Sequence, residues 1–316
     1  MHRRRFIKIA ATHLTGLSLA SGCLRAATQA KLQKVEWRGI VLGADASLQL
    51  YTLDPQKTKQ LLQQCHQLIR KLEGMFSLYQ AESTISRLNK NGRLSHAPVD
   101  FIQLLEMALQ IGTHTNGAFD ITVHPLVELY RNHFAQTNPD PSGPTEMEIA
   151  ATLKRVNYRA IEIKAQEVRF RQPDMQITLN GIAQGYITDR VSAFLKSHGF
   201  ERTLVQMGEN RALGCHPDGT PWQIGIVDAQ RAIQKVVELN DAALATSGSY
   251  GTVFEASGHV HHLINPRSGK CAQGRNTVSV IAPNATTADA LSTALAVTSS
   301  EQTSAILRHY PDCKAI

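Results

Sequence analysis

The sequence predicts an α+β fold. Segments with alternating apolar residues, typical of strands, are mixed along the chain with segments whose apolar residues recur at helical spacing. Their order lacks the regular strand–helix–strand alternation that predicts a parallel sheet. No internal repeat or low-complexity tract is present. We therefore expect residues 31–316 to form one domain, because about 290 residues suffice for a single large domain or two closely joined halves.

The first half of this domain is predicted to hold a strand pair and two long helices. Residues 35–52 alternate loosely and indicate a strand or hairpin. Residues 57–72 form an amphipathic helix, and residues 99–112 form another. Residues 137–148 are rich in Pro, Gly, Asn and Asp, which predicts a loop. The end of this loop starts a third helix, because Thr145 and Glu148 have the spacing of a capping box.

The second half is predicted to be richer in strands. Two are expected within residues 160–179, followed by a glycine-led turn into a helix that Gly199 ends. Further strands are predicted at 203–207, 222–227, 234–239 and 277–282. The last strong helix is expected to begin at Thr286, with Thr286 or Thr287 as its cap and Asp289 in its first turn.

Residues 1–27 have the pattern of an export signal. Arg3, Arg4 and Arg5 precede Phe-Ile-Lys and a short apolar run, too interrupted for a membrane span. The arginines fit the twin-arginine pattern, with an ordinary secretory signal as the alternative. The stretch LASGC resembles a lipoprotein cleavage site that would leave Cys23 lipid-anchored, and cleavage near Ala26 is the other reading. The predicted location is the periplasm or the outer face of the inner membrane.

The charge of the chain comes mostly from this signal. The formal net charge is +7, but residues 1–27 hold five basic residues and no acid, which leaves 28 basic against 26 acidic residues, a net charge of +2. No basic run interleaved with aromatic residues follows, so nothing indicates a nucleic-acid partner. Cysteines 65, 215, 271 and 313 show no zinc spacing, and no disulfide pairing follows from the sequence.

The stretch TTADALSTALAV is the sharpest local signal for chemistry. Asp289 and Thr293 are four residues apart, so a helix presents both on one face. A carboxylate and a hydroxyl are hard oxygen donors that suit Mg²⁺ held jointly with phosphate oxygens. The alternative is that Asp289 complements the helix dipole and Thr293 only packs.

Two further stretches carry weaker signals. Gly181 and Gly185 enter a helix, whose first amides attract phosphate, but the pattern matches neither standard nucleotide-binding loop. In HHLINPRSG, the adjacent His261 and His262 point to opposite faces if the segment is a strand. At most one of them is therefore expected to act on a substrate.

Taken together and in order, these stretches resemble the FAD:protein FMN transferases, the ApbE family. The marks are LGADA, FSLYQAESTISRLN, TNGAFDITVHPLVELY, LNGIAQGYITDRV, LVQMGENRALG, WQIGIVD, ALATSGSYG, HHLINPRSG and VSVIAPNATTADALSTALAV. The resemblance implies a two-lobed ApbE/T-fold-like α+β domain with FAD bound between the lobes. It also implies Mg²⁺-dependent transfer of FMN from FAD to a Ser or Thr of an acceptor redox protein, with release of AMP. The implied acceptor is a flavoprotein of a membrane or periplasmic electron-transfer system.

The resemblance also implies roles for particular residues. His262 would be the base that deprotonates the acceptor hydroxyl. Mg²⁺ would be bound by Asp289 and Thr293, with the backbone carbonyl of Gly181 and with Ser292 where many members have a further acid or small residue. The implied flavin and adenine contacts are Leu42, Tyr79, Ala118, Phe119, Asp120, Thr178, Gln184 and Leu263.

The chain departs from the family pattern at several of these positions. Thr178 and Gln184 stand where the family usually has Asp and Lys, and Leu42, Glu209 and Asn265 replace a usual Met, Gly and Asp. Losing two charged groups is expected to weaken or alter FAD binding, because a charge-assisted hydrogen bond contributes roughly 1.5–3 kcal/mol. Two alternatives therefore stay open: an FAD-binding or flavin-carrier protein without transferase activity, and an FAD pyrophosphatase.

Overall fold

A computed structural model describes residues 32–228, 230, 232–273 and 277–316 of the chain. The predicted export signal and Cys23 lie outside these residues. Within the described part, no helix has the length and apolar character needed to cross a membrane. The four cysteines found there are all free thiols.

A seven-stranded antiparallel sheet forms the centre of the fold, in the order β1-β2-β6-β7-β10-β11-β12. The strands are β1 (Gln33–Val41), β2 (Ala44–Thr52), β6 (Thr203–Met207), β7 (Asn210–Leu213), β10 (Ala243–Gly248), β11 (Thr277–Ala282) and β12 (Lys314–Ala315). The hairpin expected over residues 35–52 is therefore confirmed as β1 and β2.

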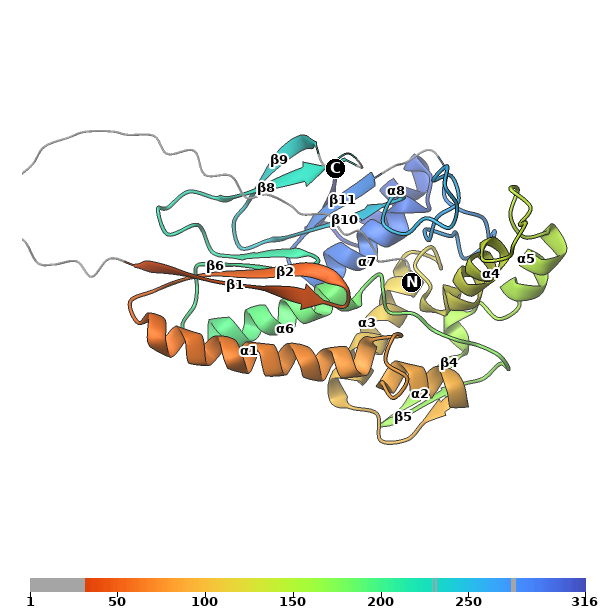
Figure 1. The fold of residues 1–316 in the computed structure, drawn as a ribbon, viewed down its shortest axis with the longest axis horizontal. Helices are drawn as coiled ribbons and strands as arrows, with labels where there is room; N and C mark the ends of the chain where they lie inside the picture. The colour runs from red at the N-terminus through yellow and green to blue at the C-terminus, as the bar shows by residue number, and fades with distance from the viewer. Residues whose placement is uncertain (1–31, 229, 231, 274–276) are drawn as a thin grey trace, which may run out of the picture.

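Both faces of this sheet are covered (Figure 1). Three helices pack on one face: α1 (Pro55–Phe76), α6 (Ala183–Ser197) and α7 (Ala285–Ala296). The hairpin of β8 (Trp222–Val227) and β9 (Ile233–Leu239) contributes to a separate apolar cluster on the other face. Period-two alternation produces this division, since Leu204 of β6 joins the cluster with Trp222 while its neighbour Val205 joins the helix-side core.

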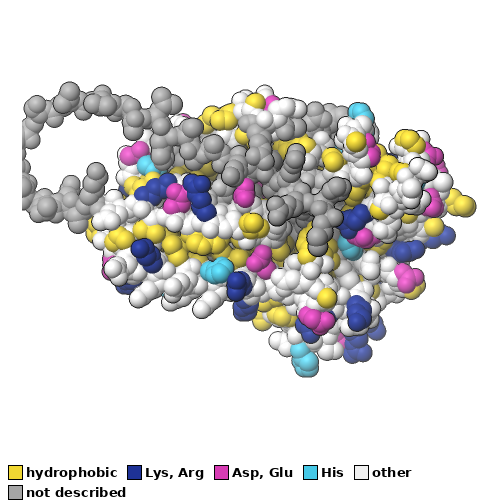
Figure 2. Space-filling view, viewed as in Figure 1, with side chains coloured by type: hydrophobic (Ala, Val, Ile, Leu, Met, Phe, Trp, Pro, Cys, Tyr) yellow, Lys and Arg dark blue, Asp and Glu magenta, His cyan; other side chains and the backbone are white. Residues whose placement is uncertain are grey.

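Shorter elements complete the domain. The helices are α2 (Thr84–Asn91), α3 (Val99–His114), α4 (His124–Phe134), α5 (Glu146–Leu153) and α8 (Ser300–Leu307), with single 3₁₀ turns at Ile121–Val123 and Tyr158–Ala160. A small antiparallel sheet joins β3 (Arg93–Leu94), β5 (Glu167–Phe170) and β4 (Ile161–Lys164). The space-filling view shows basic and acidic side chains interspersed over the visible face (Figure 2).

Most of the predicted elements are present. The long helices are α1 and α3, the capping box of Thr145 and Glu148 starts α5, and Gly199 follows α6 with a φ of 85°. The elements that the sequence did not predict are α2, α4, α8, the central strand β10, and the short strands β3, β7 and β12. The helices α2 and α8 are eight residues long, too short for helical periodicity to stand out from noise.

The predicted start of α7 was wrong by one residue. Asn284, not a threonine, is the N-cap, and its side chain accepts a hydrogen bond from the amide of Thr287. Thr286 is inside the helix because its amide and hydroxyl both donate to Asp189 of α6. Asp289 is consequently the fifth helical residue and lies beyond the first turn, so the helix dipole does not explain it.

Close packing of α6 on α7 depends on Gly185. A Cβ atom at this position would lie 2.3 Å from the backbone oxygen of Ala285 and 2.8 Å from the Cα of Thr286. We expect Gly185→Ala to lower the free energy of unfolding by about 1–3 kcal/mol, because backbone atoms must move apart. Urea unfolding measures this change. Gly74→Ala, with no atom within 4 Å of the added Cβ, is the control and should not destabilise; equal stability of both variants would contradict the prediction.

Candidate active site

A single cavity of about 620 Å³ gathers most of the residues that the sequence predicted to act together. It lies where β2, α4, α6, β10 and α7 meet the loop after α1 and the segment carrying His262. Its volume is within the range of small-molecule and cofactor sites. Twelve of the thirteen predicted site residues line it: Leu42, Tyr79, Ala118, Phe119, Asp120, Thr178, Gly181, Gln184, His262, Leu263, Asp289 and Thr293.

Leu42 reaches the cavity from the tight turn between β1 and β2. Leu42 and Gly43 have φ angles of 47° and 84°, as a two-residue hairpin turn of type I′ requires. Glycine adopts this conformation freely, but leucine is strained in it. The amide of Leu42 donates to the side chain of Glu73 at 2.8 Å, which helps to hold the strained residue at the cavity wall.

Asp120 shapes the wall formed by residues 118–120. Its carboxylate is buried and accepts hydrogen bonds from the amide and hydroxyl of Thr122 and from the amide of Tyr158. Burial raises the pKa of Asp120, while these hydrogen bonds oppose the rise. Both carboxylate oxygens of Asp120 are occupied by protein donors. Asp120 therefore shapes the cavity wall and is not a free hydrogen-bond acceptor for a ligand.

Asp289 and Thr293 lie on one face of α7, as predicted from their spacing. Asp289 is 4% exposed, and its carboxylate accepts a hydrogen bond from the amide of Gly185 at 3.0 Å. The hydroxyl of Thr293 contacts that of Ser247 at 3.2 Å. Gly181 lies against Thr293 so closely that a Cβ would come within 2.8 Å of the hydroxyl oxygen. Only glycine at position 181 therefore leaves the carboxylate, the hydroxyl and the loop backbone open to a common ligand.

Ser292 is the one predicted site residue that does not line the cavity. It is fully buried, its hydroxyl lies 2.7 Å from that of Ser247, and it donates to the backbone oxygen of Asp289 at 2.9 Å. These bonds place Ser292 behind Asp289 and Thr293, because adjacent helical residues point in directions about 100° apart. The structure thus assigns it contacts that position Asp289 and Ser247.

Glu209 is a cavity residue that the sequence reading noted only as a departure from the family pattern. It is 7% exposed, and its carboxylate accepts one hydrogen bond, from the amide of Thr246 at 3.3 Å. Burial raises its pKa well above the usual range, and the neighbouring charge of Asp289 raises it further. Neither carboxylate forms a salt bridge with any cation in the part of the chain that the structure describes.

This cluster fits a hard divalent cation. Burial and the charge of Asp189 raise the pKa of Asp289 to about 7, against one hydrogen bond that lowers it. Two buried carboxylates without a cationic partner are unfavourable unless a cation or protons neutralise them. Among the described residues, no three His, Cys, Asp or Glu side chains are placed to hold a metal ion. Protein carboxylates alone would not fill the coordination shell, and phosphate oxygens of a ligand suit the remaining positions.

The raised pKa values predict how stability depends on pH without metal. A carboxyl group with a raised folded-state pKa binds protons more tightly in the folded chain, so stability falls as pH rises from about 4 through the folded pKa. For Asp289 that window runs from 3.8 to about 7. We expect the metal-free chain to lose on the order of a few kcal/mol across it relative to Asp289→Asn.

Thermal unfolding in EDTA at several pH values, for both proteins, measures this difference. Added Mg²⁺ should restore stability near pH 8 in the wild type and much less in the variant. A difference between the two proteins that does not change with pH would contradict the shifted pKa.

The two adjacent histidines lie in different surroundings, although only an isolated bridge forms between His261 and Val253 where a strand was considered. His261 is 4% exposed, its Nε2 lies 3.1 Å from the backbone oxygen of Ala272, and burial lowers its pKa. His262 lines the cavity, and its Nδ1 lies 3.1 Å from the backbone oxygen of Thr252 and 3.2 Å from the amide nitrogen of the same residue. Thr252 therefore orients the ring from the Nδ1 side.

The cavity also contains groups that the sequence reading did not single out. His124 begins α4, lies 3.8 Å from Glu128, and has a pKa lowered by burial. Arg131, one turn further, pairs with the same Glu128. Ser247 contacts Thr293 directly. His124 and Ser247 lie within quoted motifs and Arg131 directly follows one, but a single His, Ser or Arg has no distinctive spacing that marks it as a site residue.

Thr178 and Gln184, where the resemblance predicts Asp and Lys, both lie in the cavity wall. The hydroxyl of Thr178 accepts a hydrogen bond from the amide of Asn180 at 3.2 Å. The side chain of Gln184 packs over Gly208, where a Cβ would lie 2.6 Å from its amide carbon. Both side chains therefore present neutral groups to the cavity, and the acidic Glu209 follows directly after Gly208.

The cavity has the size of a cofactor site and holds a buried acid–hydroxyl pair and a histidine within an α+β domain. Such a site is suited to phosphoryl or nucleotidyl transfer.

The ApbE family model matches residues 42–316. A relative from Vibrio cholerae named FAD:protein FMN transferase is 31% identical over 304 residues, covering 93% of this chain and 88% of the relative. The chain belongs to the ApbE family.

Solved structures of family members agree with this assignment. The structure titled flavin transferase ApbE from Vibrio cholerae has a TM-score of 0.77 at 26% identity, covering 90% of this chain and 97% of that one. The apo form of Pseudomonas stutzeri flavinyl transferase ApbE has a TM-score of 0.76 at 26% identity, covering 90% of each chain. The predicted two-lobed α+β family fold is confirmed.

Proposed function

We propose that this chain transfers FMN from FAD to a Ser or Thr hydroxyl of an acceptor protein and releases AMP. The observation that carries the proposal is the convergence of His262, Asp289 and Thr293 on one cavity of about 620 Å³. The names of the relatives support the reaction, and the donor set supports Mg²⁺ as the metal that assists it.

In the proposed reaction, the acceptor hydroxyl oxygen bonds to the phosphorus of the FMN half of FAD. The bond from that phosphorus to the bridging oxygen breaks, and AMP leaves with this oxygen. His262 takes the hydroxyl proton, since imidazole is the side chain most often used as a general base. Nδ1 lies within hydrogen-bonding distance of both the amide and the backbone oxygen of Thr252. In the tautomer in which Nδ1 donates to that oxygen, Nε2 is the proton acceptor.

Asp289, Thr293 and the Gly181 backbone would hold Mg²⁺ beside the pyrophosphate. When bound, the ion neutralises charge on the phosphates and on the departing AMP. Asp289 is kept in place by the amide of Gly185, and Thr293 by the hydroxyl of Ser247. Because Asp289 is buried, few water molecules reach this part of the cavity. The acceptor hydroxyl then has less competition from water as the nucleophile.

We further propose that the chain works outside the cytoplasm on a redox protein of a membrane or periplasmic electron-transfer system. The basic and apolar pattern of residues 1–27 supports export. Lipid attachment at Cys23 is part of this proposal. Labelling with a radioactive fatty acid, compared between wild type and Cys23→Ser, tests it.

One experiment separates transfer from the two alternative activities. The purified chain without its signal is given FAD, Mg²⁺ and a candidate acceptor domain. Flavin fluorescence on the acceptor after denaturing electrophoresis supports transfer. FMN and AMP formed without acceptor indicate FAD hydrolysis, and bound but intact FAD in both conditions indicates a carrier; either result would overturn the proposal.

A further inference from the structure

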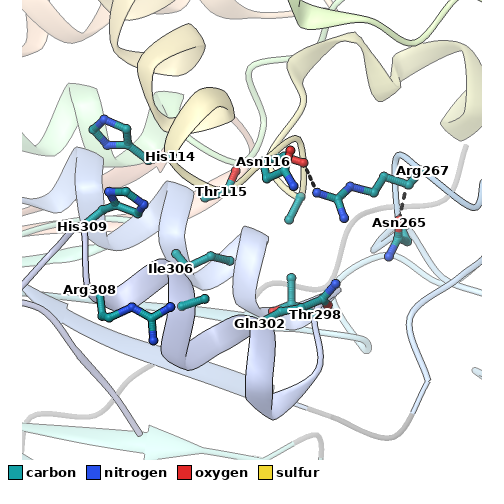
Figure 3. A pocket seen from close by; sticks show the side chains of 12 residues that line it. His114, Thr115, Asn116, Asn265, Arg267, Thr298, Gln302, Ile306, Arg308 and His309 are labelled. Atoms are coloured by element: carbon teal, nitrogen blue, oxygen red, sulfur yellow. Dashed lines mark hydrogen bonds between the residues drawn. The ribbon is translucent and has the colours of Figure 1, made fainter.

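A second cavity, of about 320 Å³, has a largely different set of lining residues, shown in Figure 3. One wall is formed by the C-terminal end of α3 and by Asn265 and Arg267. The other is formed by Thr298, by α8, and by Arg308 and His309 after it. Of the residues that the structure describes, Ala118 alone lines both cavities. Nothing in the proposed transfer uses this second cavity.

The second cavity is lined by cationic and neutral groups. Arg267 and Arg308 contribute two guanidinium groups, His114 and His309 contribute two imidazoles, and none of the lining residues is acidic. Neither arginine forms an ion pair with any described residue. Arg267 uses one Nη2–H in a hydrogen bond to the backbone oxygen of Asn116, which leaves its other donors for a ligand.

Contacts within the protein hold the loop side of this cavity in position. The amide of Arg267 donates to the side-chain oxygen of Asn265 at 2.9 Å. The side-chain nitrogen of Asn265 in turn donates to the backbone oxygen of Val297 at 3.0 Å. With its own bond to Asn116, the Arg267 side chain is fixed from both ends, so less entropy is lost when it binds a ligand.

The helical side is arranged in the same way. The rings of His114 and His309 are stacked, with centroids 5.1 Å apart and an interplanar angle of 12°. Nδ1 of His114 lies 3.0 Å from the hydroxyl of Tyr310. Ala305 and Ile306 add a small apolar surface to the wall. Ile306 lies between the imidazole rings and Arg267 (Figure 3).

We propose that this cavity binds a small phosphate-bearing molecule of up to mononucleotide size. Guanidinium groups recognise phosphate through paired N–H donors, and their planar fork makes arginine better suited to this than lysine. The flat imidazole pair and the apolar floor suit a ring attached to the phosphate. A volume near 300 Å³ is at the lower end of small-molecule sites, which excludes a dinucleotide.

Binding here is connected to the large cavity through the chain itself. Asn265 lines the second cavity, while its neighbours Ile264 and Pro266 line the first. A ligand that holds Arg267 and Asn265 therefore also restrains the segment carrying His262. By linkage, a phosphate ligand and FAD change each other's affinity by the same factor.

The test titrates AMP into the chain after saturation with FAD in EDTA, so that the large cavity is filled and no metal-dependent reaction occurs. Isothermal titration calorimetry gives the affinity. Adenosine, which lacks the phosphate, and inorganic phosphate, which lacks the ring, are the comparison ligands. Arg267→Gln/Arg308→Gln removes both guanidinium groups, and Arg87→Gln/Arg155→Gln removes two exposed arginines outside both cavities as the matched control.

The control double variant should bind AMP as the wild type does, and Arg267→Gln/Arg308→Gln should bind it at least tenfold more weakly. Because losing the Asn116 contact could disturb folding, Gln302→Glu provides a second test. The side chain of Gln302 accepts a hydrogen bond from the amide of Ser299 in a capping box. Glutamate also fills this role, so the variant adds a negative charge to the cavity while keeping the hydrogen bond. It should weaken AMP binding at least fivefold.

Equal AMP affinity in all four proteins, equal binding of adenosine and AMP, or no binding of AMP and phosphate to FAD-saturated protein would overturn the proposal. Inorganic phosphate that binds and displaces AMP supports recognition through the phosphate. The proposed function fails separately if the chain does not bind FAD. In that case the same comparison of variants in FAD-free protein still tests the second cavity.

Discussion

Asp289→Asn is expected to lower FMN transfer about 100-fold or more. The substitution keeps the size of the side chain and its ability to accept the hydrogen bond from Gly185, but it removes the charge that would hold Mg²⁺. Metal ions stabilise transition-state charge by several kcal/mol, and each loss of about 1.4 kcal/mol lowers a rate tenfold. Initial rates of flavin attachment to an acceptor domain, measured over a range of Mg²⁺ concentrations, give the effect.

The matched control for this prediction is Asp45→Asn. Asp45 also lines the large cavity, but it is exposed at its edge. This variant should retain transfer within a few-fold of the wild type. Calorimetry with Mg²⁺ or Mn²⁺ in the presence of FAD supplies a second readout, which should show metal binding lost only in Asp289→Asn. Transfer within tenfold of wild type in Asp289→Asn would remove this residue from the metal site.

His262→Gln is expected to lower transfer by roughly 10²–10⁴-fold, the usual contribution of a general base. Glutamine retains a hydrogen-bonding group near Thr252 but cannot accept the proton from the acceptor hydroxyl. FAD affinity should stay within a few-fold, because the imidazole acts on the acceptor. Single-turnover transfer and FAD fluorescence titration measure the two effects separately.

Variants of two further histidines test whether the general base is His262 in particular. His259→Gln alters an exposed imidazole three residues away that does not line the cavity, and it should leave the rate unchanged. His124→Gln alters the other imidazole inside the cavity and should lower the rate less than His262→Gln does. If His124→Gln has the larger effect, the base is His124 and the role predicted from the sequence is wrong.

The long helices, the main strands and the acid–hydroxyl pair of α7 could be predicted because their signals are local. Helical periodicity over residues 57–72 and the i,i+4 spacing of Asp289 and Thr293 depend only on backbone geometry. The capping box at Thr145 is likewise complete within four residues. At the start of α7, Asn284 was a local N-cap candidate beside Thr286 and Thr287. Only the tertiary contact of Thr286 with Asp189 of α6, 97 residues away in sequence, excludes Thr286 as the cap.

The sequence by itself determined that this chain has an α+β fold of the ApbE kind, and which polar residues could carry its chemistry. Only the tertiary structure decided which of them meet. It placed Ser292 behind the cavity, brought Glu209 beside Asp289, and gathered Arg267 and Arg308 around a second cavity. The physical reason is that burial and charge depend on neighbours from distant parts of the chain, while periodicity and capping depend on neighbours within one or two turns.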